Sequence, residues 1–256
     1  MYQLLDSGDG EKFEQFGEVR IVRPCPVAIW SPTLETWDGD CRFTRERGWE
    51  GTSHLPEQWV VTIAGIKFQL KRTDFGHLGI FPEQEPFWNK IQKSGAKKVL
   101  NLFAYSGGAS LAAAKAGAEV THVDAAKGMV QWASENAKLN NLNIRWIVED
   151  ARKFVMRAVK RGDHYDGIIL DPPTFGRGKS GEVFKIEDDL PPLLEGCFKL
   201  LKEAKFMLLS CHTPGFTPIA LKQLMPAGDI DAGEMVLCGP NSVPSGAYAY
   251  LNGPPC

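Results

Sequence analysis

Residues 99–124 decide the fold: they begin Val99-Leu-Asn-Leu-Phe-Ala-Tyr-Ser-Gly-Gly108, continue through an alanine-rich segment and close with Glu119-Val-Thr-His-Val-Asp124. An apolar strand runs into paired glycines, a helix of small residues follows, and a second strand ends in a carboxylate. Glycine lets the backbone approach a ligand closely, and open α/β sheets bind ligands at the carboxyl ends of their strands. We therefore predict a nucleoside-binding half-domain in which Asp124 accepts hydrogen bonds from ribose hydroxyls.

The spacing of the glycines indicates which nucleoside is bound. A dinucleotide-binding loop uses Gly-x-Gly-x-x-Gly to seat a pyrophosphate on a helix N-terminus. This chain has Tyr105-Ser-Gly-Gly-Ala-Ser110 instead, and its next glycine is Gly117. S-adenosylmethionine carries no phosphate and needs no such anion site. The spacing therefore favours S-adenosylmethionine as cofactor, with an NAD-binding oxidoreductase as the weaker alternative.

The segment 87–256 alternates between strand and helix patterns, which is typical of an α/β domain with a parallel sheet. The predicted strands are 98–103, 119–124, 144–149, 167–171 and 206–211, followed by an antiparallel edge pair at 234–238 and 247–251. The predicted helices include 87–93, 127–139, 151–160 and 188–201, with Pro191 and Pro192 in the first turn of the last. The fold class is thus α/β, with a seven-stranded Rossmann-like sheet.

The segment 1–86 has a different pattern, with short strands, prolines and tryptophans. We expect a small β-rich N-terminal domain with a hairpin at 59–64 and 66–71, and a role in substrate recognition. Two explanations fit its aromatic and basic residues: a surface that stacks bases and binds phosphates, or simply the core of a small β domain. The residues concerned are Trp30, Trp37, Trp49, Trp59, Arg42, Arg45 and Arg47.

The composition excludes several classes of protein. The 256 residues carry a formal net charge of −2, which gives no general attraction to nucleic acid. Six cysteines occur without a Cys-x-x-Cys pair, so we expect neither a metal site nor a disulfide framework. The apolar runs are too short for a membrane helix, and the N-terminus lacks the pattern of a signal peptide. We expect a cytoplasmic protein without a membrane partner.

Asp171-Pro-Pro-Thr-Phe175 follows the fourth predicted strand and is the strongest motif of the chain. Two prolines remove two backbone donors and fix φ, which makes a rigid turn. We expect this turn to project the Asp171 carboxylate and the Phe175 ring toward a substrate.

The segment Asn101-Leu-Phe-Ala-Tyr-Ser-Gly-Gly108 and the motif Asp171-Pro-Pro-Thr-Phe175 resemble those of class I S-adenosylmethionine-dependent methyltransferases. The resemblance extends over about residues 72–215. Within that class the two stretches are most similar to the bacterial 23S ribosomal RNA large-subunit methyltransferases that modify cytosine carbon 5 or guanine nitrogen 7. The resemblance implies an RNA substrate. Phe175 would then stack on an unpaired base, a contact worth about 1–3 kcal/mol, and Asp171 would bond the base or the amine of the donor. The resemblance also implies donor contacts from Phe103, Tyr105, Gly107, Asp124, Asp150 and Asp171, with Gln84 in Gly79-Ile-Phe-Pro-Glu-Gln84 closing over the donor. Asp150 has a second explanation, as the N-cap of the helix that follows it.

Cys211 bears on the acceptor atom. The resemblance implies that a cysteine after the fifth strand attacks carbon 6 of cytosine, which makes carbon 5 nucleophilic. The guanine-modifying relatives lack that cysteine yet share Asp-Pro-Pro-Thr-Phe, and cysteine is often simply buried. We place cytosine carbon 5 slightly ahead, with Cys211, Asp171 and Phe175 as catalytic residues. A methyltransferase for a protein side chain or a small metabolite, and an RNA-binding module without catalysis, stay open.

Overall fold

The structure is a computed structural model that describes residues 1–177, 181 and 183–254. The chain forms two compact units, one of Met1–Glu85 with Val236–Ser245 and one of Pro86–Met235 with Gly246–Cys256. The segment Val236–Ser245 was not expected in the first unit, because a strand pattern does not reveal which unit the tip of a hairpin joins. A division into two independent domains near residue 86 stays a prediction.

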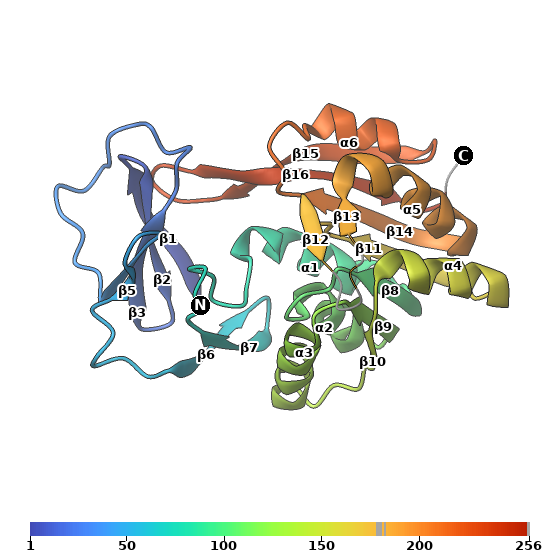
Figure 1. The fold of residues 1–256 in the computed structure, drawn as a ribbon, viewed down its shortest axis with the longest axis horizontal. Coiled ribbons are helices and arrows are strands. Elements are labelled where there is room, and N and C mark those ends of the chain that lie inside the picture. The colour runs from blue at the N-terminus through green and yellow to red at the C-terminus, as the bar shows by residue number, and fades with distance from the viewer. Residues whose placement is uncertain (178–180, 182, 255–256) are drawn as a thin grey trace. The chain divides into compact units, whose positions relative to one another are not determined.

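The second unit is built on a single seven-stranded sheet (Figure 1), which confirms the predicted α/β architecture. From one edge to the other its strands are β10 (Arg145–Val148), β9 (Glu119–Asp124), β8 (Lys98–Leu102), β11 (Tyr165–Leu170), β14 (Leu201–Cys211), β16 (Val243–Asn252) and β15 (Asp229–Leu237). The strands from β10 to β14 pair in parallel, and β16 is antiparallel to β14. The chain order reverses on either side of β8, and α/β sheets bind ligands at such a point.

Helices cover both faces of this sheet (Figure 1). They are α1 (Glu85–Lys93), α2 (Gly108–Lys115), α3 (Lys127–Leu139), α4 (Ala151–Arg161), α5 (Ile186–Leu200) and α6 (Pro218–Leu224). Leu100, Ile168 and Met207 of three neighbouring strands pack into one core cluster with α4 and α5. Alternate residues point to the opposite face, where α2 and α3 lie. This layering leaves the strand ends as the place where polar side chains gather.

The strand register lines up the predicted site at the carboxyl edge of the sheet. Leu102 of β8 pairs with Val123 of β9 and with Leu170 of β11. The next residues, Phe103, Asp124 and Asp171, are therefore neighbours across three adjacent strands. Since adjacent strands lie about 4.8 Å apart, the two aspartates are separated by roughly 10 Å along the edge.

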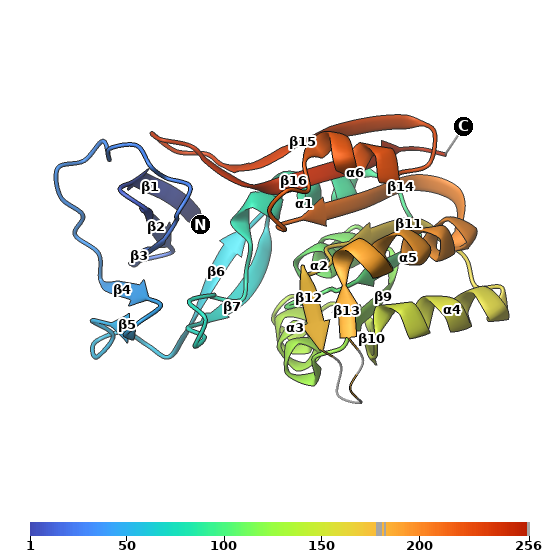
Figure 2. The same ribbon diagram turned by 45° about the horizontal axis from the view of Figure 1, so that its top comes forward.

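Several predicted boundaries were wrong in informative ways. A hairpin of β12 (Phe175–Arg177) and β13 (Val183–Lys185) follows the Asp-Pro-Pro motif and was not predicted, because strands of three residues leave no periodic pattern (Figure 2). Helix α5 begins at Ile186, so Pro191 and Pro192 lie inside it rather than in its first turn. Strands β14, β15 and β16 all extend beyond their apolar centres.

The first unit contains a five-stranded sheet in the order β1 (Tyr2–Gly8), β2 (Glu11–Phe16), β3 (Val19–Pro24), β4 (Cys41–Thr44) and β5 (Gly48–Glu50). The hairpin of β6 (Gln58–Ile63) and β7 (Ile66–Lys71) forms a separate two-stranded sheet, followed by a 3-10 helix, η1 (Pro82–Gln84). Ala64 and Gly65 connect the hairpin with φ of 49° and 70°. Positive φ at both central residues is the type I′ geometry that suits twisted strands, so the predicted hairpin is confirmed.

A buried ion pair lies inside the first unit. Glu14 is fully buried, and its two carboxylate oxygens accept from Nε and Nη2 of Arg23 at 2.7 and 2.9 Å. Burial opposes the ionisation of Glu14, but Arg23 and Lys12 outweigh it and lower its pKa to about 2. Arg23 also donates to the carbonyl of Gly76 at 3.0 Å, so the pair joins the sheet to the segment after β7.

The tryptophans of the first unit are structural. All four donate their indole N–H inside the unit, Trp30 to Ser7, Trp37 to Asp6, Trp49 to Thr73 and Trp59 to Phe16. Arg42 pairs with Glu11, and Arg47 pairs with Glu50. The unit carries nine Lys and Arg against fourteen Asp and Glu, so its formal charge is −5. These observations favour the core explanation over a surface for phosphates.

The tip of the β15–β16 hairpin completes the first unit. Leu237 and Val243 of this tip pack in a small core with Leu4, Cys25 and Ala28. Asn241 donates to the backbone carbonyls of Ser7 and Ser31 and to the hydroxyl of Thr33. Residues near the C-terminus are thus part of the N-terminal unit.

Candidate active site

The loop that follows β8 has an unusual backbone. Phe103, Tyr105 and Gly107 all have positive φ, of 54°, 50° and 95°. Only glycine adopts this region readily, and each other residue held there costs about 1–3 kcal/mol, a strain that clusters at functional sites. A Cβ on Gly107 would lie 3.0 Å from the Cβ of Ala133, so glycine is also required by space. We call residues 103–107 the donor loop.

Asn136 of α3 holds the donor loop in place. Its side chain is fully buried, and its Nδ2 donates to the carbonyl of Ser106 at 3.1 Å. A buried amide without a partner would be costly, so this bond fixes both the residue and the loop. Asn136 is a polar residue among the buried apolar residues of α3, and this hydrogen bond explains why it is there.

Asp124 lies at the end of β9 and faces the donor loop. Its Oδ2 accepts from the backbone N–H of Tyr105 at 2.9 Å, and its Oδ1 accepts from that of Ala126 at 2.8 Å. Burial raises the pKa of Asp124, and the two backbone hydrogen bonds only partly offset this effect. Each oxygen retains lone-pair capacity after these bonds. The residue is therefore suited to accept two further hydroxyl donors, as a ribose would supply.

A buried polar network lies beneath α2. Asn101 donates to Oγ of Ser110 at 2.9 Å, and this oxygen lies 3.0 Å from Nδ1 of His122. Burial lowers the pKa of His122 to about 3, so its ring is neutral at physiological pH. The ring lies edge-on to Trp146, with centroids 4.9 Å apart. This network ties α2 to β8 and β9 directly below the donor loop.

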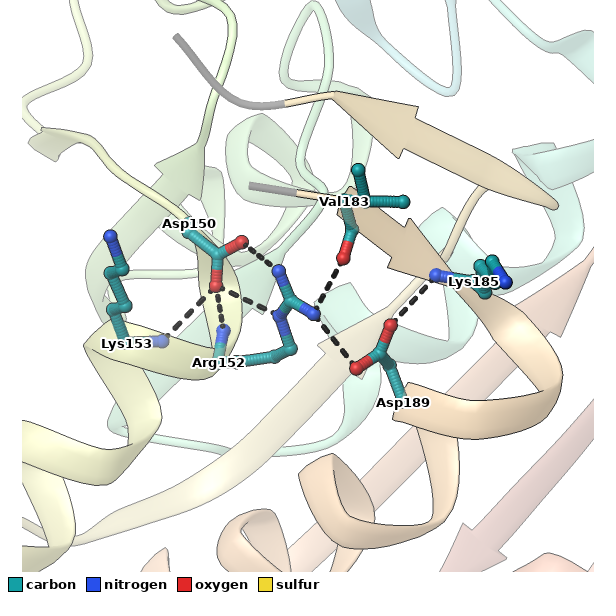
Figure 3. A network of polar contacts seen from close by, with 6 residues as sticks. All are labelled: Asp150, Arg152, Lys153, Val183, Lys185 and Asp189. Carbon is teal, nitrogen blue, oxygen red and sulfur yellow. Dashed lines mark hydrogen bonds and ion pairs between the residues drawn. The ribbon is translucent and has the colours of Figure 1, made fainter. Parts of the chain in front are cut away.

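Asp150 is the N-cap of α4, as one of its two predicted roles required. Its side chain accepts from the backbone N–H groups of Arg152 and Lys153, and Arg152 also donates to it from Nε and Nη2 (Figure 3). Burial opposes ionisation, but the Arg152 hydrogen bonds outweigh it and the pKa of Asp150 is lowered. Capping is confirmed, and contact with the adenine of a donor stays a prediction.

The Asp171 carboxylate has one oxygen without a partner. Among the described residues, Oδ1 is buried and makes no hydrogen bond. Oδ2 lies 3.8 Å from Nε2 of His212, which follows β14. The hydroxyls of Thr174 and Thr213 lie 2.8 Å apart and tie the Asp-Pro-Pro turn to the end of β14. A buried carboxylate oxygen with no donor calls for a ligand that supplies one.

Phe175 begins β12, and 49% of its side chain is exposed. An exposed ring and a carboxylate on the same short motif can together hold a flat polar group, the ring by stacking and the carboxylate at the edge of the group. Of the basic residues that follow Phe175, Lys185 is exposed, and Lys179 lies outside the described residues.

The thiol of Cys211 is buried. Only 1% of the residue is exposed, it belongs to the core cluster, and its Sγ accepts from the backbone N–H of Thr213 at 3.4 Å. Burial raises its pKa, an effect that the hydrogen bonds from Thr213 only partly offset. Reactive cysteines have lowered pKa values and exposed sulfur atoms. The role of Cys211 as a nucleophile stays a prediction, and these features do not favour it.

Gln84 lies in η1 of the first unit and is buried. Its predicted closure over the donor stays a prediction. The site contains functional candidates that the sequence analysis did not name: Arg152, Phe184 and Asp189. All three belong to contacts of the unpredicted hairpin. No group of three metal-ligating side chains occurs in the described ranges, and no helix there is long and apolar enough to cross a membrane.

Comparison with known proteins agrees with this geometry. The family model of S-adenosylmethionine-dependent methyltransferases matches residues 40–223. A crystal structure of a SAM-dependent methyltransferase from Agrobacterium tumefaciens is 37% identical, with a TM-score of 0.92 over 98% of this chain and 90% of that one. Its likeness extends over both units, which the motifs alone did not reveal.

The matches to curated relatives cover a smaller share of both proteins. The ribosomal RNA large subunit methyltransferase K/L of Hahella chejuensis is 33% identical over 197 residues, 71% of this chain and 27% of that protein. The protein of the same name from Pseudoalteromonas translucida is 34% identical over 181 residues, 67% of this chain and 25% of that protein. This chain thus spans about a quarter of the length of these relatives. With the family model and the Agrobacterium structure in agreement, the chain belongs to the S-adenosylmethionine-dependent methyltransferase family.

Proposed function

We propose that this protein transfers a methyl group from S-adenosylmethionine to a nitrogen atom of an RNA base. The observation that carries the proposal is the buried Oδ1 of Asp171, which has no hydrogen-bond partner among the described residues and belongs to the same Asp-Pro-Pro-Thr-Phe motif as the half-exposed ring of Phe175. Bases present planar N–H groups at their edges and flat faces for stacking, and a flipped base offers both at once. A carboxylate and an aromatic ring on one short motif match these two features.

The residues around the donor loop fit the cofactor. Asp124 has acceptor capacity for the two ribose hydroxyls, and positive φ at Phe103, Tyr105 and Gly107 shapes the backbone where the donor would lie. When bound, S-adenosylmethionine supplies a methyl group on a positively charged sulfur, which is already an activated leaving group. The protein then has to align donor and acceptor rather than activate either chemically.

A nitrogen acceptor needs no covalent help from the protein. Its lone pair forms the new N–C bond while the C–S bond breaks and the sulfur retains the electron pair. Where the attacking nitrogen carries a hydrogen, its proton passes to the Asp171 carboxylate. Carbon 5 of cytosine would instead require a thiolate, and the buried thiol of Cys211 has a raised pKa. The cysteine-dependent reaction on cytosine is therefore the second candidate.

RNA as the substrate class has two supports. The curated relatives are named as ribosomal RNA methyltransferases, and the second unit carries twenty Lys and Arg against seventeen Asp and Glu, a formal charge of +3. The positively charged second unit would therefore contact the RNA phosphates, rather than the first unit with its charge of −5. Protein side chains and small metabolites are the competing acceptors.

The test is transfer of label from tritiated S-adenosylmethionine to three acceptors: an unmodified large-subunit ribosomal RNA transcript, total protein, and a small-molecule extract. Labelled RNA is then digested to nucleosides and analysed by mass spectrometry. We expect label in RNA on an N-methylated nucleoside. Label confined to protein or small molecules would refute the RNA assignment. 5-Methylcytidine whose formation is abolished by Cys211→Ala would refute the nitrogen acceptor and support the cysteine mechanism.

A further inference from the structure

We infer that Arg152 is a positioning residue that clamps the β12–β13 hairpin, and with it Phe175, next to the donor loop. The expected effect on RNA methylation rests on the proposed function. The expected effect on the mobility of the hairpin rests on the structure alone. Arg152 lies in the first turn of α4, at the carboxyl edge of the sheet. It was not a candidate in the sequence, where it is one of several basic residues on that helix.

The guanidinium of Arg152 joins three separate segments (Figure 3). Its Nη1 donates to the carbonyl of Val183 in β13 at 2.8 Å and to Oδ1 of Asp189 in α5 at 2.7 Å. Its Nη2 and Nε donate to the two oxygens of Asp150 at 2.8 and 3.2 Å. The planar guanidinium, a fork of N–H donors, can donate to several acceptors in fixed directions, whereas the ammonium of lysine is a compact point charge. The fork thus bridges the end of β10 to the hairpin and to the helix after it.

Asp189 carries the connection to Phe175. Its Oδ2 accepts from the backbone N–H of Lys185 at 2.7 Å, while Oδ1 holds Arg152. Lys185 pairs directly with Phe175 across the hairpin. The backbone N–H of Ile186 also donates to the carbonyl of Thr174 at 3.2 Å. The chain of contacts from Arg152 therefore ends on the residue whose ring is proposed to stack on the base.

A ring contact supplies the second anchor of the hairpin. Phe184 of β13 is buried, and its ring centroid lies 5.0 Å from that of Phe103 in the donor loop. The guanidinium carbon of Arg152 lies 5.7 Å from the same Phe184 ring. The hairpin is thus held through a side chain of the donor loop and through the Arg152 fork.

The hairpin depends on such anchors because it is too small to be stable alone. Its described residues form three pairs between β12 and β13, and an isolated two-stranded hairpin is marginal in water. Removing the guanidinium takes a donor from the Val183 carbonyl and from Oδ1 of Asp189, and it also takes the side-chain donors from Asp150. We expect the hairpin to move more freely and Phe175 to hold a base less well, while Asp124 keeps its own hydrogen bonds.

The test compares four variants of the full chain. Arg152→Gln removes the charge and most of the fork, Arg152→Lys retains the charge alone, and Asp189→Asn weakens the connection to the hairpin without touching Asp150. Arg157→Gln is the matched control, since Arg157 lies on the same helix and pairs with Glu149 rather than with the hairpin. Hydrogen exchange of peptides covering residues 183–190 reports on the hairpin directly. Titration with S-adenosylhomocysteine and steady-state kinetics on the ribosomal RNA transcript report on function.

For Arg152→Gln and Asp189→Asn we expect faster exchange at residues 183–185 and a rise of about tenfold in KM for RNA. Asp189→Asn, which leaves the hydrogen bonds of Asp150 in place, should keep the affinity for S-adenosylhomocysteine within about twofold of the unmodified protein. Arg152→Lys should recover only part of the loss, and Arg157→Gln should match the unmodified protein in all three measurements. Unchanged exchange in both clamp variants would overturn the inference. An equal loss of donor affinity and RNA affinity in Asp189→Asn would also overturn it, as would the same effects in Arg157→Gln. If the unmodified protein does not methylate RNA, the proposed function fails, and exchange at residues 183–185 still decides the clamp.

Discussion

Phe103 and Phe184 lie with their ring centroids 5.0 Å apart and their planes inclined at 59°. One ring belongs to the donor loop and the other to the hairpin that follows the Asp-Pro-Pro motif. A single tilted aromatic contact therefore joins the segment expected to bind the methyl donor to the segment expected to bind the acceptor. Two substrates that must meet in line are more easily aligned when the segments that hold them are packed together.

Replacement of Phe184 by alanine should loosen both segments. Truncation of a buried phenylalanine costs about 3–5 kcal/mol, and Phe184→Leu should cost less because it fills part of the space. Hydrogen exchange should increase in peptides covering residues 99–108 as well as 183–190. Increased exchange in the hairpin alone would mean that the ring contact does not support the donor loop.

Asp124→Ala should weaken binding of S-adenosylhomocysteine by at least about 10- to 100-fold, which is the effect of losing one hydrogen bond to a charged group at about 1.5–3 kcal/mol. Calorimetry measures the change. Asp166→Ala is the control, because Asp166 also accepts backbone N–H groups, those of Lys97 and Lys98, but lies at the amino edge of the sheet. Equal loss of affinity in the two variants would point to a general structural effect.

The affinity of the donor should also depend on pH through Asp124, whose pKa burial raises. As the pH falls through this raised pKa, the carboxyl gains a proton and loses acceptor capacity, so affinity should fall. The contribution of Asp124 to folding stability depends on pH in the opposite direction. A raised pKa favours the folded form below the ordinary pKa of aspartate, and this contribution is lost as the pH rises through the folded pKa. Affinity that is flat over this range would exclude Asp124 as a donor ligand.

Asp171→Ala should lower kcat for methyl transfer by about 10²-fold, because the acceptor loses the group that orients it, while the dissociation constant for S-adenosylhomocysteine stays within about twofold. Asp171→Asn retains shape and one acceptor oxygen and should be intermediate. Single-turnover transfer with labelled donor separates chemistry from binding. Full activity of Asp171→Ala would remove the observation on which the proposed function rests.

Cys211→Ala should leave methyl transfer within a few-fold of the unmodified protein, since a nitrogen acceptor needs no thiolate. Cys197→Ala is a close match, because Cys197 is another buried cysteine of the same core cluster. Both variants should lose a similar, small amount of stability. Loss of transfer in Cys211→Ala alone would restore the cysteine as nucleophile.

Glu14→Gln should destabilise the first unit by about 3–5 kcal/mol at neutral pH, because it leaves Arg23 buried without its counter-charge. The lowered pKa of Glu14, about 2, gives a stabilisation that is present above the ordinary carboxyl pKa near 4.5 and lost as the pH falls toward 2. The difference between variant and unmodified protein should therefore shrink over that interval. Exchange rates of peptides covering β1–β3 measure it, and a difference that persists at pH 2 would contradict the ionised pair.

The sequence was sufficient to predict features that depend on residues close together in the chain. Strand β9 and helix α3 have the predicted bounds, because apolar periodicity and local signals act within one element. The same holds for the turn at Ala64 and Gly65 and for Asp150 as an N-cap. Asp124 and Asp171 could be assigned to one edge of the sheet, because both follow strands that the alternating pattern makes parallel.

The sequence was insufficient where a contact joins distant segments. Arg152 contacts Val183 and Asp189 only after folding, and no sequence spacing predicts these contacts. Burial of Cys211 depends on what packs over the end of β14, so a catalytic and a core cysteine look alike in a sequence. The four tryptophans could serve a surface or a core until their N–H acceptors were known.

The contribution of Leu237, Asn241 and Val243 to the first unit has a consequence for how the protein is made. A ribosome delivers residues 1–85 well before residues 237–243, so the core around Leu4 and the acceptors at Ser7 and Ser31 receive their partners only after the whole segment 86–236 has been made. The first unit therefore cannot complete its folding until residues 237–243 have been synthesised. Chains released early, before residue 237, would carry an unfinished apolar surface at their N-terminal end and should be the species that chaperones retain and proteases remove.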